Sequence, residues 1–144
     1  MAAASRPSAV LDTNVLLDAW VFADPSVAAL FAALDSGRLR WLATPAMRDE
    51  LQHTLLKPSL AAWQPDIARV LGHFDRLAHR LEAPMQSLAP TLLCRDPKDQ
   101  MFIDLALAQQ ARWLVTHDRA LLALAHKSRM HGVAVVRPAD WRLP

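Results

Sequence analysis

Apolar residues recur along this chain with two different spacings, and these spacings predict its strands and helices. Short apolar or alternating runs predict strands, and longer segments with apolar residues at helical spacing predict helices. The predicted strands cover residues 8–12, 38–43, 113–116 and 133–136. The predicted helices cover residues 13–21, 25–36, 45–57, 65–81, 97–110 and 120–127.

Capping residues mark several of these boundaries. Asp24-Pro25 and Asp96-Pro97 are favourable helix openings, because Asp can accept hydrogen bonds from free N–H groups and Pro fits the first turn. Gly37 is a plausible C-terminal stop for the second helix. Residues 83–95 contain two prolines and predict an irregular connection.

The order of the elements predicts the fold class. Strands separated by helices indicate a mostly parallel sheet covered by helices on both faces. Short, apolar strands are typical of such a covered sheet. No repeat or linker divides the 144 residues. We therefore expect one α/β domain over residues 1–144, a three-layer α/β/α sandwich whose sheet has about four to five short strands.

Four acids fall where this topology gathers side chains. Asp12 closes the first strand, and Asp118 lies two residues after the third predicted strand. Glu50 lies in the second turn of the helix that leaves the second strand, and Asp99 lies in the first turn of a later helix. Open α/β sheets place their sites at the carboxyl ends of strands, so these acids should converge on one edge.

Helical phase separates two of these acids from their acidic neighbours. Asp99 shares the inward face of its helix with Ile103, whereas Asp104 lies about 140° around the axis and should be solvated. Glu50 borders the inward stripe of its own helix, whereas Asp49 points away from it.

Each acid also has a purely structural explanation. Asp96 and Asp118 can cap the helices that follow them, and Asp99 can complement a helix dipole. Asp18 is expected to be an ordinary acid on a helix surface. Asp12 is hardest to explain in this way, because a carboxylate directly after a buried strand needs a partner or a cation.

A cluster of carboxylates points to a hard metal ion. Crowded carboxylates repel one another and become partly protonated unless a cation binds among them. Ligands that are all oxygen favour Mg²⁺ or Mn²⁺ over Zn²⁺, and neither paired cysteines nor an HExxH motif competes. Such an ion can activate water and stabilise charge that develops on a phosphoryl group. The single cysteine, Cys94, is expected to be a packing or loop residue.

Composition adds a mildly basic character. The formal net charge is +2, the sequence pI is about 9.2, and Arg supplies thirteen of the sixteen basic residues. An acidic pocket within such a surface would suit nucleic acid, although genome composition could equally explain the arginines. No apolar run suits a signal peptide or reaches the ~18–20 residues of a membrane span, and one cysteine suits a reducing compartment, so a cytoplasmic protein is expected.

Four sequence blocks resemble the PIN-domain family. They are VLDTNVLL at 10–17, PAMRDEL at 45–51, DPKDQMFIDLALA at 96–108 and LVTHDRALL at 114–122. They look most like the family's bacterial branch of toxin components from toxin–antitoxin pairs. The resemblance runs from about Ala9 to Trp141, and the closing VVRPADW is similar to the family's ending.

The resemblance implies a PIN-like sandwich that cleaves single-stranded RNA with Mg²⁺ or Mn²⁺. It also implies an antitoxin protein as a partner, and a homodimer. The family's four acids fall on Asp12, Glu50, Asp99 and Asp118. Asp96 matches an accessory acid that can join the metal ligands. The polar positions that orient the acids or contact substrate match Thr13, Asn14 and Thr116.

Two residues depart from the family pattern. His117 stands where Gly is frequent, which places a titratable group beside the expected metal. Lys98 stands where another acid is common, which lowers the local negative charge. Neither replaces one of the four main acids.

Two other classes of protein remain as alternatives. One is a phosphoryl-transfer protein, either a receiver domain or a dehalogenase-like phosphatase, because both use a strand-end Asp with Mg²⁺. The phosphatase motif needs a second Asp two residues on, where this chain has Asn14. The other is a PIN fold that binds RNA or protein without cleaving anything.

Overall fold

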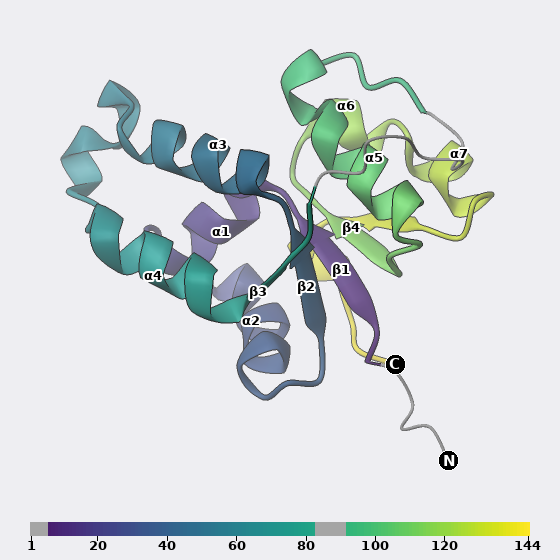
Figure 1. Cartoon of the computed structure of the whole chain (residues 1–144), viewed down its shortest axis with the longest axis horizontal. Helices are drawn as coiled ribbons and strands as arrows, with labels where there is room; N and C mark the ends of the chain where they lie inside the picture. Colours follow the sequence, from purple (N-terminus) through teal and green to yellow (C-terminus); the bar gives the residue numbers. More distant parts are fainter. Residues whose placement is uncertain (1–5, 83–91) are drawn as a thin grey trace.

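The core of the molecule is a five-stranded sheet in which every strand is parallel (Figure 1). The structure is a computed structural model that describes residues 6–82 and 92–144. The strand order is β3-β2-β1-β4-β5. This order differs from the order 2-1-3-4-5 of receiver domains, which excludes the receiver domain among the alternatives. The strands are β1 (Ser8–Leu11), β2 (Arg40–Ala43), β3 (Ala78–Arg80), β4 (Trp113–Val115) and β5 (Ala134–Val136).

The central strand β1 is buried because its residues are apolar on both faces. Ala9, Val10 and Leu11 are at most 1% exposed. Ala9 pairs with Trp41 of β2 on one side and with Trp113 of β4 on the other. A small residue between two tryptophans leaves room for the indoles. Continuous apolar runs are what a strand covered on both faces requires.

Helices cover both faces of the sheet (Figure 1). Right-handed crossovers place the helices that connect β1, β2 and β3 on one face, and those around β4 and β5 on the other. The α-helices are α1 (Thr13–Trp20), α2 (Ala28–Asp35), α3 (Pro45–Leu55), α4 (Ile67–Leu77), α5 (Gln100–Ala108), α6 (Arg119–Leu122) and α7 (Ala125–Arg129). The 3-10 turns are η1 (Pro25–Val27), η2 (Pro58–Trp63), η3 (Pro97–Asp99) and η4 (Pro138–Asp140).

None of the helices over 6–82 and 92–144 is by itself long and apolar enough to cross a membrane. Helix α1 and the segment Pro25–Asp35 pass the test of length and composition only as a pair, which is bent by 111°.

The predicted α/β sandwich is confirmed, and the sheet holds five strands. The strand that the pattern missed is β3, since the helix expected over 65–81 ends at Leu77 and the chain then becomes extended. Leu77 and Leu81 continue the helical spacing, which conceals the change. Ala78 pairs with Trp41, and the N–H of Leu81 donates to the carbonyl of Ala43 over 2.8 Å. Pairing with β2 therefore overrides the helical pattern.

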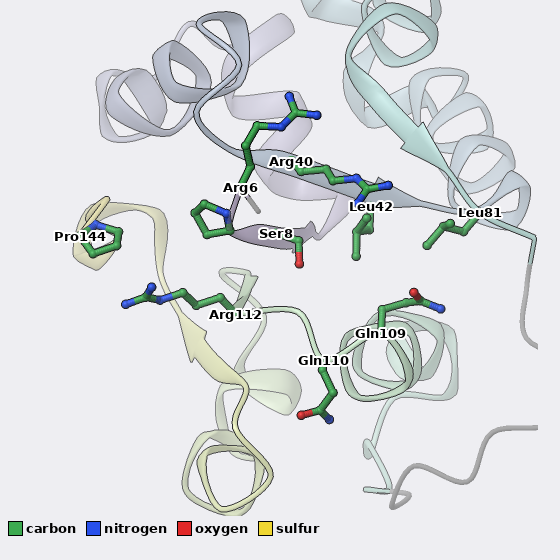
Figure 2. A pocket seen from close by; sticks show the side chains of 10 residues that line it. Arg6, Ser8, Arg40, Leu42, Leu81, Gln109, Gln110, Arg112 and Pro144 are labelled. Carbon is green, nitrogen blue, oxygen red and sulfur yellow. The ribbon is translucent and has the colours of Figure 1, made fainter. Parts of the chain in front are cut away.

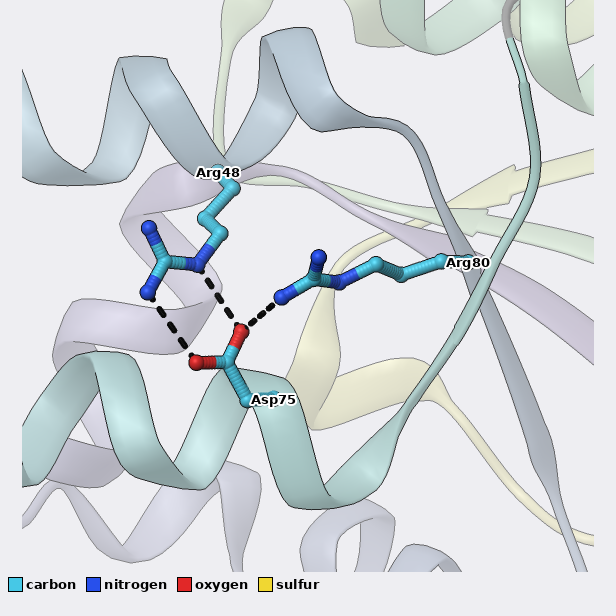
Figure 3. A network of polar contacts seen from close by, with 3 residues as sticks. All are labelled: Arg48, Asp75 and Arg80. Carbon is cyan, nitrogen blue, oxygen red and sulfur yellow. Dashed lines mark hydrogen bonds and ion pairs between the residues drawn. The ribbon is translucent and has the colours of Figure 1, made fainter.

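An ion-pair network fixes this edge strand to the neighbouring helices (Figure 3). Arg48 of α3 binds Asp75 of α4 through two hydrogen bonds of 2.8 and 3.0 Å. Arg80 of β3 binds the same carboxylate. Asp75 therefore joins two helices and a strand, and its hydrogen bonds with Arg48 hold the pKa of its carboxyl below its usual value.

Several helices are shorter or more divided than expected. The helices expected over 25–36 and 97–110 each open with a 3-10 turn, and that expected over 120–127 is split into α6 and α7. The predicted caps are confirmed: Asp24 accepts from the N–H of Ser26, and Gly37 has a φ of +75° after α2. Residues 83–91 of the expected irregular connection lie outside the described residues, and 92–95 form no helix or strand.

Candidate metal centre

The candidate site lies where the connections of the sheet change direction. Strands β1 and β4 are neighbours, and the N–H of Asp12 donates to the carbonyl of Val115 over 3.0 Å. The chain leaves β1 toward β2 and leaves β4 toward β5, on opposite sides. Parallel α/β sheets form a crevice at such a point, beyond the carboxyl ends of the strands.

A buried hydroxyl links the two acids that flank this point. Thr116, which is fully buried, donates to Oδ2 of Asp12 over 2.7 Å. The same hydroxyl accepts from the N–H of Asp118 over 2.9 Å. Asp118 also caps α6 by accepting from the N–H of Ala120 over 2.7 Å. These bonds hold the ends of β1 and β4 in one arrangement.

Three carboxylates approach most closely. One oxygen from each of Asp96, Asp99 and Asp118 lies within 4.8 Å of the other two. Asp96 caps η3 by accepting from the N–H of Lys98 over 3.0 Å, as predicted. Asp99 follows in the same turn, and its Oδ2 is buried without a hydrogen-bond partner among the described residues. A buried carboxylate oxygen of this kind needs a cation or a proton.

Glu50 reaches the site from the opposite helical layer. It lies on α3, whose buried stripe includes Met47 and Leu51. The hydroxyl of Thr54, one turn later, donates to the Glu50 carbonyl over 2.8 Å and lies 3.4 Å from Oε1. This i, i+4 contact holds the base of the side chain near the pocket.

One small pocket of about 240 Å³ collects these side chains. It contains every acid that the sequence proposed as a metal ligand, together with two lysines. Its walls are formed by Asp12, Thr13, Asn14, Glu50, Thr54, Lys57, Asp96, Lys98, Asp99 and Asp118. The pocket is therefore lined by both acidic side chains and lysines.

Asp99 and Asp12 are held toward their neutral forms. Burial raises the pKa of Asp99 to about 8, and the nearby carboxyls of Asp118, Asp12 and Asp96 add to the effect. Burial also raises the pKa of Asp12, and Asp118 and Glu50 contribute, while the Thr116 hydroxyl opposes the rise. A divalent cation would reverse this effect by favouring the charged forms.

The site residues proposed from the sequence therefore line one pocket, with the exception of Thr116. Thr116 does not line it but positions Asp12 and Asp118. Asp49 and Asp104 are exposed, as helical phase predicted. Thr54 and Lys57 were missed, although both follow Glu50 at the helical spacings of four and seven residues.

Two predictions about neighbouring residues are wrong. Asp18 was expected on a helix surface, but its side chain is only 12% exposed and its Oδ2 lies 2.6 Å from Nε2 of His117. His117 was expected beside the metal, but it is not among the residues that line the pocket. Its ring instead contacts Asp18 on α1. The two residues can meet because α1 and the loop after β4 begin at the same edge of the sheet.

The residues present fit a hard divalent cation. The donors are carboxylate oxygens, three of them within 4.8 Å of one another, and the orphaned Oδ2 of Asp99 supplies an unused ligand. Oxygen ligands of this kind suit Mg²⁺, Mn²⁺ or Ca²⁺, and a site without Cys or His ligands is a poor zinc site.

Comparisons with known proteins agree on the fold. The chain resembles a chain in the crystal structure of VapBC2 from Rickettsia felis bound to a promoter DNA fragment, with a TM-score of 0.58, 14% identity, and coverage of 90% of this chain and 98% of that one. It resembles PAE2754 from Pyrobaculum aerophilum with a TM-score of 0.54, 20% identity, and coverage of 90% and 83%. No curated protein sequence matches it. The sequence profile of the PIN domain matches residues 8–120, most of the chain, and the chain therefore belongs to the PIN-domain family.

Proposed function

We propose that the chain is a Mg²⁺- or Mn²⁺-dependent endoribonuclease that cleaves single-stranded RNA. The observation that carries this proposal is the buried, unpartnered Oδ2 of Asp99 inside a group of three carboxylates. Membership of the PIN-domain family supports the nuclease class. Asp12, Glu50, Asp99 and Asp118 are the proposed metal ligands, and Asp96 is an accessory ligand.

Different residues of the chain would hold the metal, position its ligands and contact the substrate. Bound metal supplies positive charge at the scissile phosphate and makes water more acidic. Thr116 holds Asp12 and Asp118 in register, and Thr54 holds Glu50. Thr13 and Asn14, at the start of α1, are proposed to orient the acids or contact substrate.

The two lysines of the pocket have a complementary role in this scheme. Lys57 and Lys98 are exposed at its walls. Their ammonium groups would attract phosphates that flank the scissile bond and reduce the repulsion between RNA and the carboxylates. The departure from the family pattern at Lys98 is thereby compatible with RNA binding.

We further propose that the chain is the toxin of a toxin–antitoxin pair, with an antitoxin protein as partner, and that it forms a homodimer. The sequence blocks of the bacterial toxin branch support this assignment. The fold similarity to VapBC2, a toxin–antitoxin complex, supports it at the level of architecture. Co-purification with the product of a neighbouring gene, followed by loss of RNA cleavage in the complex, would test the pairing.

The test of the activity compares two single-atom exchanges on the same helical segment. Purified wild-type protein should cleave a labelled single-stranded RNA when Mn²⁺ is added. Asp99→Asn should lower the rate by on the order of 10²–10³-fold, because it removes charge at the centre of the site. Asp104→Asn is the matched control, since Asp104 is exposed and hydrogen-bonds only Gln100 among the described residues.

Binding of Mn²⁺, measured by thermal shift or electron paramagnetic resonance, distinguishes a nuclease from a module that binds metal but does not cleave RNA. Metal binding without cleavage by the wild type would favour the non-catalytic binding module. Equal cleavage by wild type and Asp99→Asn would mean a different site or a contaminating nuclease, and would overturn the proposal.

A further inference from the structure

A second and larger cavity opens where β1, β2 and β4 begin and extends along the sheet to Leu81, just after β3 (Figure 2). Its volume is about 470 Å³. Three arginines belong to it, and no acidic side chain does. We call it the arginine groove. Its lining residues are Arg6, Pro7, Ser8, Arg40, Leu42, Leu81, Gln109, Gln110, Arg112 and Pro144.

The sheet itself sets the spacing of these arginines. The N–H of Arg40 donates to the carbonyl of Pro7 over 2.9 Å, and the N–H of Arg112 donates to the carbonyl of Ser8 over 2.9 Å. Arg40 and Arg112 therefore stand one strand to either side of the start of β1. Neighbouring parallel strands lie about 4.8 Å apart, so the two backbones are about 10 Å apart. Figure 2 shows Arg40 and Arg112 on facing walls, with Ser8 between them.

None of the three arginines has a carboxylate partner among the described residues. Arg6 donates to the carbonyl of Gly37 over 3.3 Å, and Arg40 donates to Nε2 of His79. The Arg112 guanidinium lies over the Trp113 ring, 5.0 Å from its centroid. Each guanidinium has five N–H donors, so these contacts leave most of the donors unused. In contrast, Arg48, Arg76 and Arg80 all pair with aspartates.

Helix dipoles account for only part of this arrangement. Helix α5 ends at Ala108, and the partial negative charge of its last carbonyls attracts a cation. That effect falls off within one turn, so it cannot explain arginines on both sides of β1. The dipole of α5 alone therefore does not account for all three arginines.

The other lining groups favour a ligand larger than a single ion. Gln109 and Gln110 are exposed, and amides can both donate and accept hydrogen bonds. Nε2 of Gln110 already donates to the carbonyl of Leu107 over 3.0 Å, so Gln109 is the better placed of the two. Leu81, which is half-buried, provides apolar surface on which a sugar or base can rest. A cavity of 300 Å³ or more is in the range of ligand sites. Arginine forks match phosphate oxygens in two-point contacts.

We propose that the arginine groove binds phosphate esters, either successive phosphates of a single RNA strand or those of a free nucleotide. The arginines supply contacts to at least two phosphates, and Gln109 faces the attached base or sugar. The site is separate from the acidic pocket, because the two lie at opposite ends of the same strands. Binding here does not require that the acidic pocket cleave RNA.

The experiment measures binding without divalent metal, so that cleavage plays no part. The probes are a fluorescein-labelled oligouridylate of about twelve nucleotides, followed by anisotropy, and ATP, followed by calorimetry. The variant is Arg40→Gln with Arg112→Gln. The control is Arg69→Gln with Lys127→Gln, which makes the same change of charge at exposed positions of α4 and α7 that do not line the groove.

The groove variant should weaken the binding of one probe by about tenfold or more at low salt, and the control should not. For the RNA strand, the slope of log K against log salt should fall by about 1.4, or about 0.7 for each phosphate that the variant no longer neutralises. Weaker binding of the RNA alone would identify a strand, and weaker binding of ATP would identify a nucleotide site.

NMR of the wild type makes the test independent of the variant's folding. The bound probe should shift the side-chain amide signals of Gln109 and Gln110. Equal binding by both double variants, with no shift at these amides for either probe, would overturn the proposal.

Discussion

Strand β1 begins between two arginines and ends next to a carboxylate. At the amino edge of the sheet, Ser8 lies between Arg40 and Arg112. Farther along β1, at the carboxyl edge, Asp12 accepts a hydrogen bond from Thr116. The sign of the charge alone teaches little, because helix N-termini at the carboxyl edge favour anions and helix C-termini at the amino edge favour cations.

Burial distinguishes the two edges. Asp12 is 3% exposed and Thr116 is fully buried, so the carboxyl edge is rigid and its charges are poorly solvated. Arg6 and Arg112 are exposed, so the amino edge keeps its charges in water. A small, hard ion suits the first arrangement and a larger, diffuse anion suits the second. We therefore expect the largest effects where the charges are buried and the smallest where they are solvated.

Changing the pH should alter the carboxyl edge most strongly. Because the pKa of Asp99 is raised to about 8, the metal-free folded protein keeps a proton that the unfolded chain loses above about pH 4. The free energy of unfolding without metal should therefore fall as pH rises from about 4 to 8. Metal displaces this proton, so the affinity for Mg²⁺ should rise on the order of fiftyfold between pH 6 and pH 8.

Calorimetry in two buffers of different ionisation enthalpy measures both the affinity and the proton release. Asp99→Asn should remove most of the pH dependence, leaving the smaller part due to Asp12, whose pKa is also raised. An affinity for Mg²⁺ that is independent of pH, with no proton released, would show that Asp99 is not a metal ligand.

Removing the buried Thr116 hydroxyl should have the next largest effect. Thr116→Val keeps the shape of the side chain but removes the hydrogen bonds that this hydroxyl makes to Oδ2 of Asp12 and to the N–H of Asp118. Residues that orient metal ligands typically contribute 10–100-fold to affinity, and we expect about tenfold for Mn²⁺ here. The unpaired groups should also cost about 1–3 kcal/mol of unfolding free energy.

Ser128→Ala is the matched control for this hydroxyl. Ser128 is also fully buried and donates to the carbonyl of Val133 over 2.9 Å, and it does not line the acidic pocket. Removal of its hydroxyl should lower stability without changing metal affinity. If Thr116→Val loses stability only, the hydroxyl serves the fold and does not position the acids.

The ion pairs of Asp75 provide a smaller effect that involves no ligand. Asp75→Asn should lower the unfolding free energy by about 1 kcal/mol at neutral pH, since the Asp75 side chain is 40% exposed and solvent weakens its pairs with Arg48 and Arg80. The pKa of Asp75 is lowered, so this stabilisation exists above about pH 4 and disappears as pH falls through the lower value in the folded state. Urea unfolding at several pH values measures it, and an undiminished difference well below pH 4 would contradict this origin.

Features that depend on residues close in sequence could be predicted, and features that depend on distant residues could not. The apolar runs of β1 and β4 and the caps at Asp24 and Asp96 are local, and they were predicted. Strand β3 was not, because its residues Ala78–Arg80 include exposed His and Arg and become extended only by pairing with β2. A polar edge strand carries little hydrophobic signal.

The same distinction holds within the candidate site. The four acids could be placed at one edge from topology, because Asp12 and Asp118 follow strands there. Asp99 and Glu50 lie in the first two turns of helical segments that begin at that edge. The contact between Asp18 and His117 joins residues 99 positions apart, and no pattern in either segment indicates it. Thr54 could have been found from its spacing to Glu50, because an i, i+4 neighbour on a helix lies on the same face. The arginine groove needs the sheet register, which places Arg40 and Arg112 beside Ser8.

The smallest expected effect tests whether the arginines serve the fold. Arg40→Gln should change the unfolding free energy by less than about 0.5 kcal/mol, because the side chain has no carboxylate partner among the described residues. The change should become more stabilising when salt is lowered from about 200 to 50 mM, since removing one charge relieves repulsion from Arg6 and Arg112 that salt otherwise screens. Urea unfolding at the two salt concentrations measures both quantities. A loss above about 1 kcal/mol would mean that Arg40 stabilises the sheet edge through its bond to His79, and the contrast between a rigid acidic edge and an unpaired basic edge would fail.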